Sequence, residues 1–164
     1  NATTPQRQDT TVPTQALFFL NDPFFHAQAE RVARRALEKG DGAARLGVLT
    51  DLGVSTPHVE ATLSGCDALV LETNHCLELL AGSDYPYPLK QRIAGRLGHL
   101  DNGSSAALLG RIDTTRLKHI IAAHLSQQNN TPAKARSALA EALGCAEDWI
   151  GIADQAEGFG WRDL

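Results

Sequence analysis

Several features that mark large classes of proteins are missing from this sequence of 164 residues. No apolar run approaches the roughly 20 residues that a membrane-spanning helix needs. The early apolar run at residues 16–20 is short and has neither the basic flank nor the cleavage site of a signal peptide. The three cysteines form no CxxC pair, and an odd number fits a reducing compartment better than a disulfide framework. We therefore expect a cytoplasmic protein without a membrane partner.

Excess positive charge and the common nucleotide-binding and nucleophile motifs are missing as well. The formal net charge is −4, which argues against binding nucleic acid through overall positive charge. A local metal or a basic pocket could still bind phosphate. No P-loop pattern, GxGxxG or GxSxG occurs, so ATPase, dinucleotide-binding and serine-hydrolase functions have no support.

The composition that is present is that of one globular domain. Hydrophobic residues make up 43% of the chain and charged residues 21%, enough to form a buried core. Because the chain begins with Asn1, we expect a processed or excised piece. Residues 1–13 should be extended or poorly ordered, and an amphipathic helix should begin at Asp22 and Pro23. The apolar stripe of this helix, expected to pack against the sheet predicted below, is Phe25, Ala29, Val32 and Ala36.

Short apolar runs alternate with helical patterns in the rest of the chain. Four runs have the length of buried strands: residues 46–50, 68–72, 117–123 and 149–153. The helical stretches between them are residues 56–63, 89–95, 104–112 and 132–143. Buried strands that alternate with helices predict an α/β fold, which we expect to contain a mixed sheet with flanking helices.

Polar residues stand where three of these strands stop. Asp51 follows the first strand, Glu72 with Asn74 and His75 ends the second, and His124 follows the third. Ligands in α/β folds usually bind at the carboxyl ends of strands, so we expect these residues at one edge of the sheet. Asp51 could ligate a metal or act as a base, or it could cap a helix or turn. His124 could be a ligand or a hydrogen-bonded packing residue.

Two further histidines lie among short polar residues. His99 and His75 could each contact phosphate, support a metal site or be an ordinary turn residue. A nucleophilic pair of Cys76 and His75 is conceivable. Adjacent side chains usually diverge, however, which disfavours that pair.

An ordered set of short segments carries a resemblance to a known family. The segments are Arg45 to Gly53, Leu69 to His75, Tyr85 to Arg92, Gly98 to Leu100, Ala123 to Pro132 and Ala153 to Gln155. With them, residues 41–164 resemble the C-terminal half of the small metallo-β-lactamase-fold hydrolases, in the cytoplasmic phosphodiesterase and exonuclease-like group. Each segment alone is weak evidence for this family, but the ordered set is specific. The resemblance covers about three quarters of the chain.

That resemblance implies half of an αββα sandwich with a metal site at one edge, and hydrolysis of phosphodiesters in nucleic acid or nucleotides. It assigns Asp51 to the carboxylate that bridges two ions and His124 to the last histidine ligand. The implied cofactor is a divalent metal, zinc or manganese, which lowers the pKa of water and neutralises a phosphoryl transition state. The other expected site residues are His99 and His75 as catalytic residues and Asn74 and Asn130 as substrate-binding residues.

Two substitutions and one missing motif separate this chain from that family. Cys76 stands where the family usually has Asp, and Asp101 stands where it usually has Ser. The HxHxDH motif, which belongs to the N-terminal half of that fold, does not occur. Two ligands rarely hold a catalytic ion. We therefore expect incomplete metal binding and weak or absent turnover.

Residues 1–40 do not supply the missing half. The segment from Thr10 to Phe24 and the helix after it resemble the C-terminal part of an uncharacterised domain common in planctomycete-type proteins. We expect two segments of unlike origin, joined near residues 38–42 as a natural rearrangement or an engineered chimera. One hypothesis is a metal-dependent phosphodiester hydrolase in partial form. The other is an inactive α/β fragment that forms a homodimer through its exposed sheet face.

Overall fold

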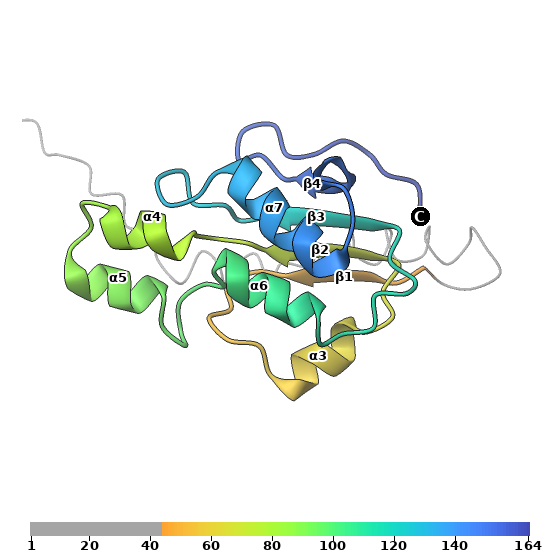
Figure 1. Ribbon diagram of the computed structural model, residues 1–164. Helices are drawn as coiled ribbons and strands as arrows, with labels where there is room; N and C mark the ends of the chain where they lie inside the picture. Colours follow the sequence, from red (N-terminus) through yellow and green to blue (C-terminus); the bar gives the residue numbers. More distant parts are fainter. Residues whose placement is uncertain (1–43) are drawn as a thin grey trace, which may run out of the picture. The chain divides into compact units, whose positions relative to one another are not determined.

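Four parallel strands form the centre of the part of the chain that the computed structural model describes, residues 44–164 (Figure 1). They lie side by side in chain order as β1 (Leu46–Leu49), β2 (Ala68–Glu72), β3 (His119–Ala123) and β4 (Ile150–Ile152). The predicted strands and the α/β class are confirmed. The expectation of a mixed sheet is wrong for the described residues, because every neighbouring pair is parallel. Each connection between successive strands contains a helix, and such a crossover returns the chain to the edge from which it started.

Helices fill these connections. They are α3 (Pro57–Leu63), α4 (Leu77–Gly82), α5 (Tyr87–Ile93), α6 (Asn102–Leu109), α7 (Pro132–Leu143) and the short 3-10 helix η1 (Glu147–Trp149). Thr56 and Thr131 begin α3 and α7 by accepting a backbone hydrogen bond, and proline follows each of them. All four predicted helical stretches are present, and α7 has the predicted bounds. Helix α4 was not predicted from the sequence, because its 6 residues are too few to show a periodic pattern.

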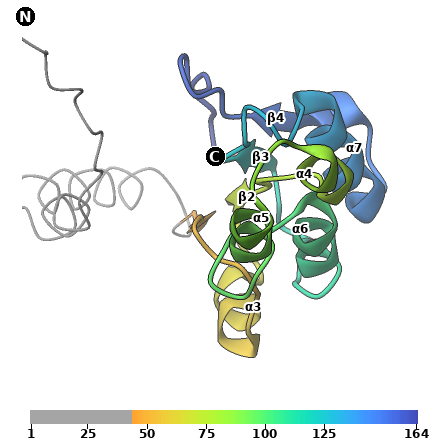
Figure 2. The same ribbon diagram turned by 90° about the vertical axis from the view of Figure 1, so that its left-hand side faces the viewer.

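One face of the sheet packs against α6 and α7 (Figure 2). The strands contribute alternate side chains to this core, namely Leu69, Leu71, Ile120, Ala122 and Ile150. The helices contribute Leu108, Leu109, Leu139 and Ala140. Burying one large apolar side chain contributes roughly 1.5–3 kcal/mol. The core therefore holds the carboxyl ends of the strands in fixed relative positions.

The opposite face of the sheet has less cover. Val70 and Ile121 lie on it, together with Leu46 of the edge strand β1, which is exposed. The C-terminal segment returns over part of this face (Figure 2). Phe159 and Trp161 of this segment line a cavity with these strand residues. A homodimer through this face stays a prediction.

Several expectations fall on the first part of the chain. The extended segment at residues 1–13 and the helix from Pro23 lie outside the described residues, so the packing of that helix stays a prediction. Within residues 44–164, no helix has the length and apolar character to cross a membrane.

Asp67, just before β2, joins the amino ends of three strands. Its carboxylate accepts the backbone N–H of Arg45 at 2.8 Å and pairs with the Arg116 guanidinium at 3.0 Å. Its carbonyl oxygen accepts the backbone N–H of Lys118 at 2.7 Å. The hydrogen bonds from Arg45 and Arg116 outweigh burial and hold the pKa of Asp67 below its ordinary value of 3.8. This carboxylate is therefore bound most strongly in its ionised form.

We expect acid to weaken the fold through Asp67. A carboxylate whose pKa is lowered by folding stabilises the folded state above its unfolded pKa, and this contribution disappears as pH falls from about 5 through the folded pKa. Asp67→Asn should lower the melting temperature by several degrees at neutral pH and flatten the pH dependence of melting. Asp84→Asn is the matched control, because Asp84 is exposed and forms no ion pair with residues 44–164. Identical melting curves for the two variants at neutral pH would contradict this role of Asp67.

Candidate metal centre

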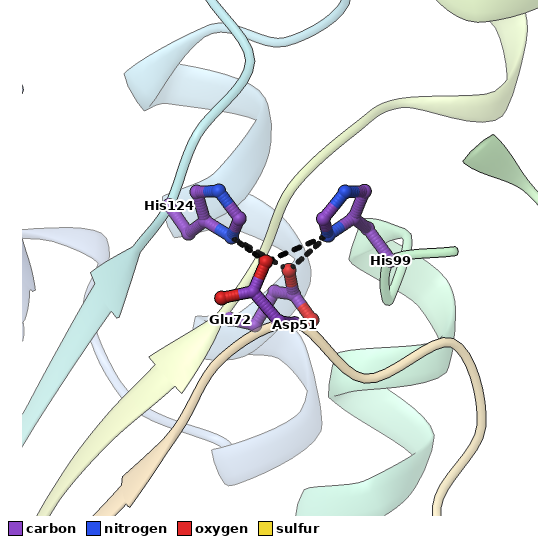
Figure 3. A group of neighbouring side chains, drawn as sticks. All are labelled: Asp51, Glu72, His99 and His124. Carbon is purple, nitrogen blue, oxygen red and sulfur yellow. Dashed lines mark hydrogen bonds and ion pairs between the residues drawn. The ribbon is translucent and has the colours of Figure 1, made fainter. Parts of the chain in front are cut away.

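Four side chains able to bind a metal meet at the edge of the sheet where the strands end (Figure 3). Asp51 follows β1, Glu72 is the last residue of β2, His124 follows β3, and His99 lies in the loop before α6. One ligand atom from each residue lies within 4.8 Å of the others. The expected proximity of Asp51, His99 and His124 is therefore confirmed.

Glu72 is the buried centre of this cluster. Its Oε1 lies 2.8 Å from Nδ1 of His99 and 2.8 Å from Nδ1 of His124. Its Oε2 accepts the backbone N–H of Leu52 at 2.9 Å and of Leu100 at 3.3 Å. A carboxylate has about four lone-pair sites, and these contacts occupy all of them. Glu72 therefore fixes both rings and has no free oxygen for an ion.

The contacts of Glu72 also determine which ring nitrogen of each histidine is free. An ionised carboxylate only accepts hydrogen bonds, so Nδ1 of His99 and of His124 must each carry the proton. The other nitrogen of each ring, Nε2, points away from the carboxylates (Figure 3). Metal-binding histidines commonly donate one ring N–H to a carboxylate and bind the ion through the other nitrogen. Both rings make such a contact with Glu72 through Nδ1.

Asp51 is the accessible carboxylate of the cluster. Its side chain is 70% exposed, and Oδ1 lies 3.8 Å from Nδ1 of His99 and 3.9 Å from Nδ1 of His124. Within residues 44–164, its carboxylate accepts no hydrogen bond, so its oxygens are free to bind an ion. Asp51 and the two imidazoles make three protein ligands, the usual number in a catalytic zinc site. Carboxylate and imidazole donors suit zinc and manganese alike, and this donor set fits a divalent ion.

Hydrogen bonding controls the charge of the cluster. Burial alone would raise the pKa of Glu72, but hydrogen bonds from His124, Leu52, His99 and Leu100 outweigh it and hold the pKa below its usual value. The hydrogen bond to Glu72 raises the pKa of His124 in spite of burial, and the charge of Asp51 adds to this effect. Glu72 is therefore ionised near neutral pH, as its acceptor role requires.

The backbone is strained at two members of the cluster. Asp51 has φ 60° and His124 has φ 56°, both in the left-handed region, and they are the non-glycine residues with positive φ among residues 44–164. Side chains other than Asn, Asp and His rarely adopt this conformation, and strain of this kind gathers at functional sites. The side chain of Asn74 donates a hydrogen bond to the carbonyl oxygen of His124 at 2.7 Å and helps to hold this turn.

A close backbone approach brings the loop of Asp51 near the loop of His99. A side chain added at Gly53 would collide with the carbonyl oxygen of Gly95, so only glycine fits at that position. The loop after β1 can therefore lie directly against the end of α5. This contact keeps Asp51 beside the segment that carries His99.

His75 does not join the cluster. It is fully buried, and within the described residues neither ring nitrogen has a hydrogen-bond partner. Burial lowers the pKa of His75, so the ring is neutral near pH 7. A catalytic role for His75 stays a prediction, and a ring with no exposed surface would have to act without touching substrate.

Asn130 has structural partners within the described residues, and its expected contact with substrate stays a prediction. Its amide group donates to the carbonyl oxygen of Thr73 at 2.8 Å and to Asn102 at 2.8 Å. Its oxygen accepts the side chain of Asn102 at 3.0 Å and the backbone N–H of Thr131 at 2.9 Å. All of its polar atoms are therefore occupied. Asn74 is nearly buried but lines a cavity beside His99 and His124, so its expected contact with substrate remains a prediction.

The two residues that depart from the family pattern both precede helices. Asp101 is the N-cap of α6 and accepts the backbone N–H groups of Gly103 and Ser104 at 2.8 and 3.1 Å. It performs the capping function for which Ser is equally suited. Cys76 precedes α4 without forming a side-chain cap. The replacement at Cys76 therefore leaves a short helix uncapped and adds no group to the metal cluster.

Part of the chain is similar in sequence to known nucleases. The chain is 33% identical over 113 residues to an exodeoxyribonuclease, YycJ, of Bacillus anthracis, a match covering 69% of this chain and 42% of the relative. It is also 33% identical over 105 residues to an exodeoxyribonuclease, WalJ, of Streptococcus pneumoniae strains D39 and R6, covering 64% of this chain and 39% of the relatives. The chain thus spans about two fifths of the length of these curated relatives. The predicted resemblance to exonuclease-like hydrolases is supported at this coarse level.

The first part of the chain is similar to a different family. The family model described as PSD1, protein of unknown function (DUF1553), matches residues 1–68. This supports the resemblance of residues 1–40 to an uncharacterised domain. The match runs past residue 40, however, and includes β1 and α3. The position of a join between unlike segments stays a prediction.

Three members of the cluster, Asp51, His99 and His124, were predicted as site residues from the sequence. Glu72 was expected at the same edge of the sheet but without a role of its own. Its role depends on burial beside hydrogen-bond donors from distant segments, which no local pattern records. Three residues that could hold an ion lie together with a buried glutamate that contacts two of them.

Proposed function

We propose that residues 44–164 provide a metal-dependent site for phosphodiester hydrolysis, acting on DNA. The observation that carries the proposal is the convergence of Asp51, Glu72, His99 and His124 at the sheet edge of a chain similar to exodeoxyribonucleases. A divalent ion at such a site polarises a phosphoryl oxygen and lowers the pKa of water. Zinc and manganese are the ions that these donors suit best.

Some residues of the cluster would bind the ion, and others position the residues that bind it. Asp51 and the imidazoles of His99 and His124 would hold the ion. Glu72 contacts Nδ1 of each ring and so fixes the orientation of both imidazoles. The exposed position of Asp51 leaves the ion side of the cluster open to a phosphodiester. Asn74 supports the turn of His124 through its backbone carbonyl.

Asp51→Asn tests this proposal most directly. Asparagine adopts positive φ about as well as aspartate, so the backbone should keep its conformation while one charged ligand is lost. We expect the full chain to bind about one zinc or manganese ion and to hydrolyse a simple phosphodiester such as bis(p-nitrophenyl) phosphate slowly. Asp51→Asn should lower metal affinity by at least about a hundredfold and abolish the hydrolysis. Metal content after dialysis and the rate of p-nitrophenol release measure both effects.

The inactive-fragment hypothesis predicts a different result. Asp84→Asn removes an exposed carboxylate outside the cluster and should behave as the wild type. Absence of hydrolysis in the wild type would support an inactive fragment, whereas equal hydrolysis in the wild type and Asp51→Asn would contradict the role of Asp51. Metal binding without hydrolysis would confine the role of residues 44–164 to metal binding.

A further inference from the structure

Positive charge gathers beside the metal centre, although the chain is acidic overall. Residues 85–100 contain Lys90, Arg92 and Arg96 and no acidic residue, in a chain of net charge −4. Lys90 donates to the carbonyl oxygen of Ala81 at 2.6 Å, so its position is fixed on α4. Within residues 44–164, Arg92 and Arg96 form no ion pair and no side-chain hydrogen bond. Their guanidinium groups are free to bind an anion.

Arg92 and Arg96 differ in where they lie. Arg92 lines a cavity of about 390 Å³ together with Asp51 and His99, whereas Arg96 does not line it. Leu89 and Leu97 form apolar parts of the same cavity. Arg92 is thus the cation that shares a cavity with two members of the metal cluster.

A second cavity lies on the other side of His99. It measures about 300 Å³ and is lined by His99, His124 and Ile93, and Ile93 and His99 belong to both cavities. Most of its remaining lining is made of side-chain amides and one phenol, from Asn74, Gln127, Gln128, Asn129, Gln155 and Tyr85. Amides offer a donor and an acceptor side by side, as the edges of nucleobases do, and aromatic rings stack on bases.

We propose that an unpaired DNA strand crosses the metal centre, with a base in the amide-lined cavity and the neighbouring phosphate on Arg92. The inference rests on the proposed function and adds the residues that position the substrate. A guanidinium matches two phosphate oxygens with two parallel N–H donors, so it can fix orientation as well as charge. A base inside a duplex cannot enter a separate cavity of this kind, which is why the strand must be unpaired.

The charge of Asp51 predicts that strand binding depends on a divalent ion. Asp51 lies in the same cavity as Arg92, and its carboxylate would repel a phosphate there. A divalent ion at the cluster offsets that charge. Binding of a strand through Arg92 should therefore be stronger with manganese present than with a chelator.

The experiment measures, by fluorescence anisotropy in a buffer that contains manganese, the binding of a short single-stranded DNA oligonucleotide to the full chain. Phosphorothioate linkages make the probe resistant to hydrolysis, so that binding is measured apart from turnover. Arg92→Ala should weaken binding by about tenfold. It should also reduce by about one the slope of the logarithm of the binding constant against the logarithm of salt concentration. Arg96→Ala is the matched control, since it removes the same charge outside both cavities, and it should change the affinity by less than about threefold. An oligonucleotide that lacks its terminal base should also bind less tightly to the wild type.

The possible failures are distinguishable. If the wild type binds the probe and Arg92→Ala binds equally well, the role of Arg92 is wrong and the hydrolytic proposal stands. If both arginine variants lose the same affinity, the contact is general charge attraction, and the positioning role is again wrong. If the wild type binds no probe and hydrolyses no phosphodiester, both proposals are wrong.

Discussion

Glu72→Ala is expected to lower the free energy of unfolding by about 3–5 kcal/mol, as for other buried charges that lose their partners. The substitution deletes the buried carboxylate that accepts two partly buried ring contacts and the backbone N–H groups of Leu52 and Leu100. These donors lie on segments that follow three different structural elements, so their loss loosens the whole edge of the sheet. Unfolding in urea, followed by circular dichroism, gives the free energy directly.

Glu60→Ala is the control for this substitution. Glu60 also accepts an arginine hydrogen bond, from Arg111 at 2.7 Å, but the pair lies at the surface. Surface pairs of this kind contribute about 0–1 kcal/mol. Equal free energies for Glu72→Ala and Glu60→Ala would show that Glu72 is not the buried centre of the site.

Glu72→Gln separates the folding role from the metal role. Glutamine keeps the shape of glutamate but places a donor where the protein presents four donors, so one or more contacts must be lost. We expect metal affinity to fall by about ten- to a hundredfold, as is typical when the carboxylate partner of a metal-binding histidine is changed. Unchanged affinity would mean that the two rings are positioned without Glu72.

Asn130→Ala is expected to destabilise the fold by about 2–3 kcal/mol, because several buried groups would lose their partner at once. The carbonyl oxygen of Thr73, the side chain of Asn102 and the backbone N–H of Thr131 all bond to Asn130. Gln128→Ala, at an exposed neighbouring position, should change stability by less than about 0.5 kcal/mol.

A double-mutant cycle with Asn102→Ala tests the pairing within this network. Asn102 and Asn130 exchange hydrogen bonds at 2.8 and 3.0 Å, so their effects on stability should not add. We expect a coupling energy of about 0.5–3 kcal/mol. If Asn130→Ala instead left stability unchanged and raised the KM for a phosphodiester, the predicted role of Asn130 in substrate binding would be supported.

The sequence was most informative where patterning and turn chemistry agree. The four strands and helix α7 were predicted because apolar runs of strand length alternate with a capped, periodic helix. The same alternation favours parallel strands, and the expectation of a mixed sheet gave too little weight to the helix in every connection. The placement of polar residues at strand ends predicted the edge on which the site lies.

The details of the site depend on contacts between distant segments, which no local pattern records. His99 and Glu72 are 27 positions apart, and Glu72 and His124 are 52 apart. Whether Asn130 meets substrate or Asn102 is likewise decided by packing. The close approach of Gly53 to Gly95 was also hidden, because a glycine in a loop fits many conformations.

The positive φ angles at Asp51 and His124 have a consequence for how such a chain can diverge over time. Aspartate and histidine adopt this conformation more often than most side chains, but glycine adopts it without steric cost and would relax the turn after β3. In a lineage that no longer needs the imidazole, selection for stability alone should replace His124 with glycine or asparagine. Retention of histidine at that turn in related sequences would therefore mark the lineages in which the site is still in use.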